Sequence, residues 1–188
     1  MTKLLSQEQV SQYQDSGFVS PLDVLDQEEI NRCLTVADEE AGCMQVIPGS
    51  HKNDFIDHND DSDPNNMIPR GQGLAIEVDT KTAESMPLQA GQMSLHHTKL
   101  FHASFNNRRA TRRIGFGISY IPAEVRDIGN TPAHALLVRG EDKYNNFLPE
   151  KRLAAPGSPE QFDYHLNLMK QFRKRQDEGA SFSKAKIE

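Results

Sequence analysis

Hydrophobic positions recur along the chain with two spacings, and these spacings predict two kinds of element. Apolar residues three or four positions apart predict a helix at residues 7–16 and an amphipathic helix at residues 160–176. Between them, short apolar or alternating runs predict strands. The expected strands cover residues 18–25, 43–47, 74–78, 93–97, 100–102 and 113–120. The pattern therefore predicts a mostly β protein with flanking helices.

Two capping boxes mark the starts of helices near the N-terminus. Ser6 is followed three positions later by Gln9, and Asp26 is followed three positions later by Glu29. Gly17 is suited to end the first helix in a left-handed conformation. We expect residues 1–36 to form two helices and one strand.

Composition divides the remainder of the chain. Residues 52–73 are rich in Asn, Asp, Pro and Gly, which predicts a long irregular loop within a β core over residues 37–126. Residues 127–188 are expected to be a C-terminal extension that carries the amphipathic helix. A chain of 188 residues is long enough for one hydrophobic core, so we expect a single domain, 1–188.

Charge and cysteine usage exclude several classes of partner. The net charge of −6 argues against nucleic acid, and the basic runs at 108–113 and 170–175 are interpreted as solvated faces. No apolar run approaches the ~20 residues that span a bilayer, so no membrane partner is expected. Cys33 and Cys43 form no CxxC pair, and no secretion signal is evident. We predict reduced thiols in a cytoplasmic protein.

The last predicted strand has two contrasting faces. Bulky apolar residues alternate with small or polar ones, so that each kind shares a face. The apolar face carries Ile114, Phe116, Ile118 and Tyr120, and the other carries Arg113, Gly115, Gly117 and Ser119. This contrast is typical of a strand that lines a polar cavity.

His102 precedes Arg113 by eleven residues, so a hairpin between their strands would place imidazole and guanidinium in one cavity. Imidazole is a usual ligand of a divalent transition metal, and a buried arginine binds a carboxylate with two hydrogen bonds. Such a pair is what an enzyme needs to hold a keto acid on iron. A hydrogen-bonded histidine and a surface arginine in a basic turn are the structural alternative.

The same residues carry a family resemblance. The segment from His102 to Arg113, His-Ala-Ser-Phe-Asn-Asn…Arg-Ile-Gly, resembles the distal half of the active site in the phytanoyl-CoA dioxygenase family. Residues 40–52, Glu-Ala-Gly-Cys-Met-Gln-Val-Ile-Pro-Gly-Ser-His-Lys, are similar to that family's second signature. Residues 5–25 are similar to its N-terminal helix and strand. The resemblance covers most of residues 5–126.

The resemblance implies a cupin-like double-stranded β-helix, or jelly roll, that binds Fe(II) and 2-oxoglutarate. Family members hydroxylate an unactivated C–H bond of a small-molecule substrate and decarboxylate 2-oxoglutarate to succinate. His102 is then the distal metal ligand, and Arg113 binds the far carboxylate of 2-oxoglutarate. Arg112 replaces Arg113 if the strand register slips by one residue. Ser104 and Asn107 would support these ligands and shape the turn.

One part of the family pattern is not where the family places it. The other two metal ligands normally come from a His-x-Asp upstream of residues 48–51, the Pro-Gly-Ser-His turn, and none is present there. The chain thus resembles a member with an internal deletion and a partial jelly roll. The one His-x-Asp, His58-Asn-Asp60, lies downstream and is the candidate metal pair. The sequence leaves open an active dioxygenase, a truncated inactive member, a non-haem iron halogenase and a metal-free acid-binding module.

Overall fold

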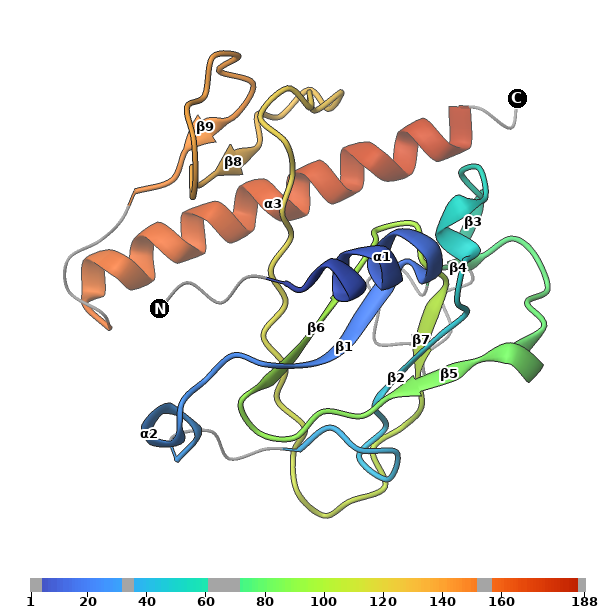
Figure 1. The fold of residues 1–188 in the computed structure, drawn as a ribbon. Coiled ribbons are helices and arrows are strands. Elements are labelled where there is room, and N and C mark those ends of the chain that lie inside the picture. The colour runs from blue at the N-terminus through green and yellow to red at the C-terminus, as the bar shows by residue number, and fades with distance from the viewer. Residues whose placement is uncertain (1–4, 32–35, 61–71, 152–156, 186–188) are drawn as a thin grey trace. The chain divides into compact units, whose positions relative to one another are not determined.

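The chain forms two compact units, which are Met1–Phe116 and Gly117–Glu188. The computed structural model describes residues 5–31, 36–60, 72–151 and 157–185, and Figure 1 shows its ribbon. The division between the units falls inside the stretch that the sequence assigns to the β core. All of the site residues predicted from the sequence belong to the first unit.

The first unit consists mainly of short strands. Its helices are α1 (Gln7–Ser16) and α2 (Gln27–Ile30), and single 3-10 turns lie at Ser50–Lys52 and Thr80–Thr82. Its strands are β1 (Phe18–Asp23), β2 (Met44–Val46), β3 (His58–Asp60), β4 (Gln72–Leu74), β5 (Glu84–Met86), β6 (Gln92–His96) and β7 (His102–Ser104). The prediction of a mostly β protein with flanking helices is confirmed.

Both helices begin at the predicted capping boxes. The Ser6 side chain accepts a hydrogen bond from the Gln9 backbone N–H at 3.2 Å, and the Gln9 side chain accepts one from the Ser6 N–H at 2.8 Å. Asp26 and Glu29 form the same reciprocal pair. Gly17 ends α1 with a φ of 84°, a left-handed conformation that favours glycine. As a result, α1 turns directly into β1.

Two antiparallel sheets of the first unit share one core. β1 pairs with β6, and β2 lies between β5 and β7. Phe18 of β1, Val46 of β2 and Met86 of β5 pack with Leu100, which precedes β7, and each of the four is only 1–6% exposed. Removing these apolar side chains from water stabilises the fold. Because the cluster takes side chains from both sheets and from the segment between β6 and β7, it holds the two sheets together.

The strand and hairpin predicted for residues 113–120 are wrong. The segment has no regular secondary structure and pairs with no strand among the described residues. Its apolar side chains are exposed, with Phe116 at 92%. An alternating pattern forms a strand only beside a partner, and β7 ends at Ser104 and pairs with β2 alone. Residues 113–120 therefore have the alternation of a strand but no neighbouring strand, among the described residues, with which to pair.

The other predicted strands are present with shifted ends, except at residues 74–78. There the chain bends at residues 75–76, immediately after β4. The predicted irregular loop 52–73 contains part of a small hairpin, in which β3 pairs with β4, while residues 61–71 lie outside the described residues. The sequence pattern missed β5, because only Met86 of its three side chains is buried.

The second unit contains one long helix and a minimal sheet. α3 (Pro159–Ala185) covers the predicted helix at 160–176 and continues beyond it. β8 (His134–Ala135) and β9 (Leu148–Pro149) pair in parallel. Among the described residues, no helix has both the length and the apolar character to cross a bilayer.

Candidate functional site

β7 places two of the predicted site residues on one face of the three-stranded sheet. His102 pairs with Val46 of β2, and Ser104 pairs with Met44. Partners that face each other in an antiparallel pair project to the same side, and residues two apart in a strand share a face. Because Val46 points into the core, His102 and Ser104 lie on the core side of the sheet, at its exposed edge strand.

The backbone before β7 determines which ring nitrogen of His102 carries the proton in the neutral ring. Its Nδ1 lies 2.7 Å from the carbonyl oxygen of Leu100. A carbonyl oxygen only accepts hydrogen bonds, so Nδ1 carries the proton and donates it. In the neutral ring the lone pair then belongs to Nε2, which is the atom that can bind a metal. Leu100 is buried in the core, so this arrangement rests on a fixed part of the fold.

Arg113 reaches the same face although its predicted strand is absent. Its Nη1 donates to the carbonyl oxygen of Gly42 and lies 3.5 Å from the Ser104 hydroxyl oxygen. Ser104, which shares a face of β7 with His102, is therefore also next to the guanidinium. Arg112, the alternative from the sequence, is exposed and makes no hydrogen bond or ion pair with the described residues.

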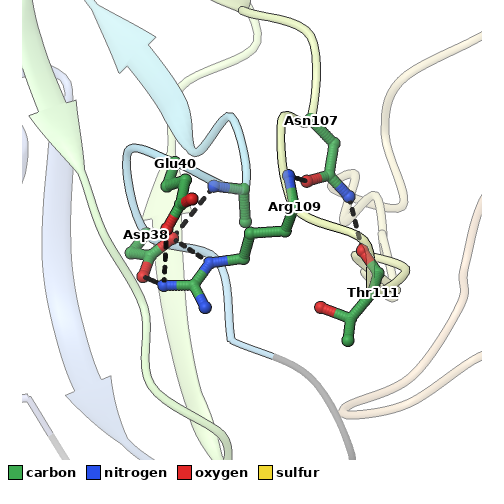
Figure 2. A network of polar contacts seen from close by, with 6 residues as sticks. Asp38, Glu40, Asn107, Arg109 and Thr111 are labelled. Atoms are coloured by element: carbon green, nitrogen blue, oxygen red, sulfur yellow. Dashed lines mark hydrogen bonds and ion pairs between the residues drawn. The ribbon is translucent and has the colours of Figure 1, made fainter.

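The loop that delivers Arg113 is tied to an acidic turn, as Figure 2 shows. Arg109 donates from Nε to Asp38 at 3.1 Å, forms an ion pair with the same carboxylate through Nη2, and lies 3.4 Å from a Glu40 oxygen. The hydrogen bond from Arg109, followed by one from the Ala41 N–H, holds the pKa of Asp38 below its ordinary value. The basic run at 108–113 is thus partly a structural clamp, rather than only a solvated face.

Asn107 closes the turn inside this loop. Its side-chain oxygen accepts from the Arg109 N–H at 2.9 Å, and its amide nitrogen donates to the Thr111 carbonyl at 2.8 Å (Figure 2). This is the local bonding by which asparagine favours turns. The sequence analysis did not predict the pairing of Asp38 with Arg109. The one feature of the sequence that could have indicated it is the opposite charge of the two turns, acidic around Asp38 and basic around Arg109.

A second imidazole lies beside His102. The ring of His96, at the end of β6, has its centroid 5.5 Å from that of His102, with the two planes inclined by 54°. The packing of groups around His96 lowers its pKa, and repulsion by His102 lowers it further. His96 is therefore biased toward the neutral form, the one that binds metals.

The described residues contain no group of three or more His, Cys, Asp or Glu side chains placed to hold a metal ion. His58 and Asp60, the candidate pair from the sequence, lie in β3, where they pair with Leu74 and Gln72 of β4. The side chain of His58 is exposed. Their role as metal ligands stays a prediction.

A hollow of about 510 Å³ opens beside β2. It is lined by Glu39, Cys43, Gln45, Ser85, Phe105, Asn106 and Arg108. Gln45 donates to Ser85 at 3.3 Å and alternates with Met44 and Val46, so it lies on the face opposite His102. Burial raises the pKa of the Cys43 thiol, which favours its uncharged form. Cys33 lies outside the described residues.

Comparison with known proteins shows which family the chain resembles. Residues 13–115, more than half of the chain, match the family described as phytanoyl-CoA dioxygenase (PhyH). The chain belongs to this family. Among curated proteins, none matches the chain significantly.

Two solved structures resemble the chain. The apo form of the non-haem monooxygenase ThoJ shares 31% sequence identity with a TM-score of 0.65, covering 79% of this chain and 52% of that one. A nickel complex of ThoJ shares 25% identity with a TM-score of 0.56, covering 87% of this chain and 61% of that one. The chain thus corresponds to roughly half to three-fifths of the length of these structures.

Proposed function

We propose that the protein is an Fe(II)- and 2-oxoglutarate-dependent oxygenase acting on a small organic molecule. In the overall reaction one oxygen atom of O2 enters a C–H bond as hydroxyl, and 2-oxoglutarate takes the other as it becomes succinate and CO2. Family membership and the likeness to ThoJ support this class. Under the same proposal, the sheets of the first unit are part of a jelly roll.

The placement of Arg113 against Ser104, on the side of the sheet that carries His102, is the observation that carries this proposal. A guanidinium binds a carboxylate through two parallel hydrogen bonds, and it keeps its charge at all working pH values. Arg113 would therefore hold the far carboxylate of the keto acid. Ser104 and the carbonyl of Gly42 orient its side chain before the ligand arrives.

The residues present fit a metal ion in part. His102 offers the lone pair of Nε2, while a three-ligand group is not found among the described residues. When bound, a non-haem iron with a keto acid supplies the activation of dioxygen. What this chain contributes is the imidazole of His102, the guanidinium of Arg113 and the Ser104 hydroxyl beside that guanidinium.

Calorimetric titration with 2-oxoglutarate tests the proposal, with oxygen excluded and Ni²⁺ in place of iron. We expect Arg113→Gln to weaken binding by roughly tenfold or more, because charged hydrogen bonds are lost. Arg112→Gln is the matched control, and we expect it to bind as the wild type does. Equal losses in both variants would contradict the role of Arg113. Absence of any binding by the wild type, together with no succinate formed with Fe(II) and O2, would contradict the function itself.

A metal-free acid-binding module is the second candidate. It is favoured by one observation, the presence of the positioned arginine without a three-ligand group in the described part of the chain. The same titration distinguishes the two functions. An acid-binding module binds 2-oxoglutarate equally with and without metal and is indifferent to His102→Ala, whereas the oxygenase binds the keto acid more tightly when the metal is present.

A further inference from the structure

We infer that His96 supplies a second imidazole to the metal site, so that His96 and His102 together hold one divalent transition-metal ion. The choice of iron as the working metal rests on the proposed function. The pairing of the two rings does not, because it comes from the geometry of β6 and β7.

The spacing of the rings suits a shared ion. A nitrogen ligand lies about 2.0–2.1 Å from the metal, which puts the ring centre about 3.2 Å from it. Two such rings at ligand–metal–ligand angles of about 90–120° have centres about 4.5–5.5 Å apart. The observed 5.5 Å between the centroids of His96 and His102 falls at the upper end of this interval. The spacing of the two ring centres is therefore compatible with one ion bound by both imidazoles.

The fold holds both imidazoles at the edge of one core. His96 pairs with Phe18 across β6 and β1, and His102 pairs with Val46 across β7 and β2. Phe18 and Val46 belong to the same buried cluster. Partners in a strand pair project to the same side, so the two histidines extend from neighbouring points of that core. Both are exposed, which leaves an ion a path from solvent.

Each of the two rings has a nitrogen available to a metal ion. Nδ1 of His102 is occupied by the Leu100 carbonyl, which leaves Nε2 for a metal. His96 makes no hydrogen bond to the residues that the structure describes. Its partner contact is the ring of His102 itself. Two neutral imidazoles suit Ni²⁺, Co²⁺, Cu²⁺, Zn²⁺ and Fe²⁺, and they leave other positions on the ion open to a keto acid.

A second histidine pair in the same unit shows that spacing alone does not make a site. The rings of His51 and His97 lie 5.4 Å apart at 50°, almost the same arrangement. Their nitrogens are used differently: Nε2 of His51 donates to the Gln14 carbonyl at 3.0 Å, and Nδ1 of His97 accepts from the Lys99 N–H at 3.1 Å. The remaining Nδ1 of His51 is buried. The pair of His51 and His97 therefore serves as a control for the effect of ring spacing alone.

Anaerobic titration with Ni²⁺, without 2-oxoglutarate, tests the inference. Even residues that only support metal ligands cost about 10–100-fold in affinity when replaced, so loss of a direct ligand should cost at least tenfold. We expect that loss in His96→Ala and His102→Ala, and wild-type affinity in the control His97→Ala. Pulsed electron paramagnetic resonance with Cu²⁺ should count two coordinated imidazoles in the wild type and one in either variant. Circular dichroism and His96→Gln, which retains a polar side chain, separate lost ligation from lost folding.

The outcomes separate the inference from the proposed function. Wild-type affinity in His96→Ala, with affinity lost in His102→Ala, overturns the inference and leaves the oxygenase proposal standing. An equal loss in His97→Ala also overturns it. Loss confined to His96 and His102, in a protein that never forms succinate with Fe(II) and O2, supports the inference and contradicts the oxygenase. A wild type that binds no Ni²⁺ overturns the inference outright.

Discussion

At the scale of single residues, Gly17 is one of the glycines of the first unit with no room for a side chain. It ends α1 and begins the turn into β1 with a φ of 84°. A Cβ atom added there would lie 2.9 Å from Cδ1 of Leu100 and would overlap the ring of His51. The absence of a side chain at Gly17 therefore lets the end of α1 pack closely against two other parts of the unit. One is His51 of the Pro-Gly-Ser-His turn, and the other is Leu100, whose carbonyl orients His102.

We expect Gly17→Ala to lower the free energy of unfolding by about 1–3 kcal/mol, because left-handed backbone and steric overlap both oppose the new methyl group. Gly49→Ala is the matched control. Its φ of 79° carries the same backbone cost, but the nearest atom to its Cβ is the Asp15 carbonyl oxygen at 3.9 Å. Urea denaturation followed by circular dichroism measures both variants. Equal destabilisation would show that crowding at Gly17 contributes nothing.

The pair of Asp38 and Arg109 predicts a response to acid. Because the pKa of Asp38 is lowered in the folded protein, the unfolded chain binds its proton first as the pH falls. The contribution to stability is complete above the ordinary carboxyl value of 3.8 and is lost as the pH falls through the lower folded value. The melting temperature should therefore decline more steeply below about pH 4 in the wild type than in Arg109→Met. Parallel declines would contradict the pairing.

At the scale of elements, α3 is anchored to a loop of its own unit at a few polar contacts. Glu178 accepts from the N–H of Thr131 at 3.0 Å and from its hydroxyl at 2.6 Å, which together hold the pKa of Glu178 below its ordinary value. Arg175, one turn earlier on the helix, forms an ion pair with Asp127. The two contacts lie on one face of the helix.

Replacing Glu178 should loosen this loop without unfolding the helix. In Glu178→Gln the charge-assisted bonds to the buried Thr131 become neutral or are lost. We expect hydrogen exchange at the Thr131 amide to accelerate several-fold, while amides in the middle of α3 exchange as before. Lys170→Gln, on the same helix, is the control. Unchanged exchange at Thr131 would show that the anchor is not used in solution.

The elements that the sequence predicts well are those whose signals are local. Ser6 and Gly17 define α1 by capping and backbone conformation, and both behave as expected. The segment at residues 113–120 fails because alternation indicates which side chains share a face, but not whether another strand is present to pair with. Arg113 nevertheless reaches Ser104, because the clamp at Arg109 places the loop. That clamp depends on residues 71 positions apart, which local patterns do not register.

At the scale of the whole molecule, the edge strand β7 and its surroundings stand out in the first unit. β7 is the edge of its sheet, and its other side has no partner among the described residues. No group of three His, Cys, Asp or Glu side chains is placed to hold a metal within those residues, on the face that carries His102 or elsewhere. The solved ThoJ structures match this chain over 52% and 61% of their own lengths, so they contain further residues beyond the shared part.

The exposed segment around Phe116 is expected to be sensitive to proteolysis. Proteases cut most readily where the chain is exposed and not already paired in a sheet, and residues 113–120 have that form among the described residues. We expect brief digestion with chymotrypsin to cleave first after Phe116, and mass spectrometry to find fragments that match the two units. Phe116→Ala should slow this first cut, and a first cut after Phe55 would contradict it. The junction between the units would then set the lifetime of the intact chain wherever such enzymes are present.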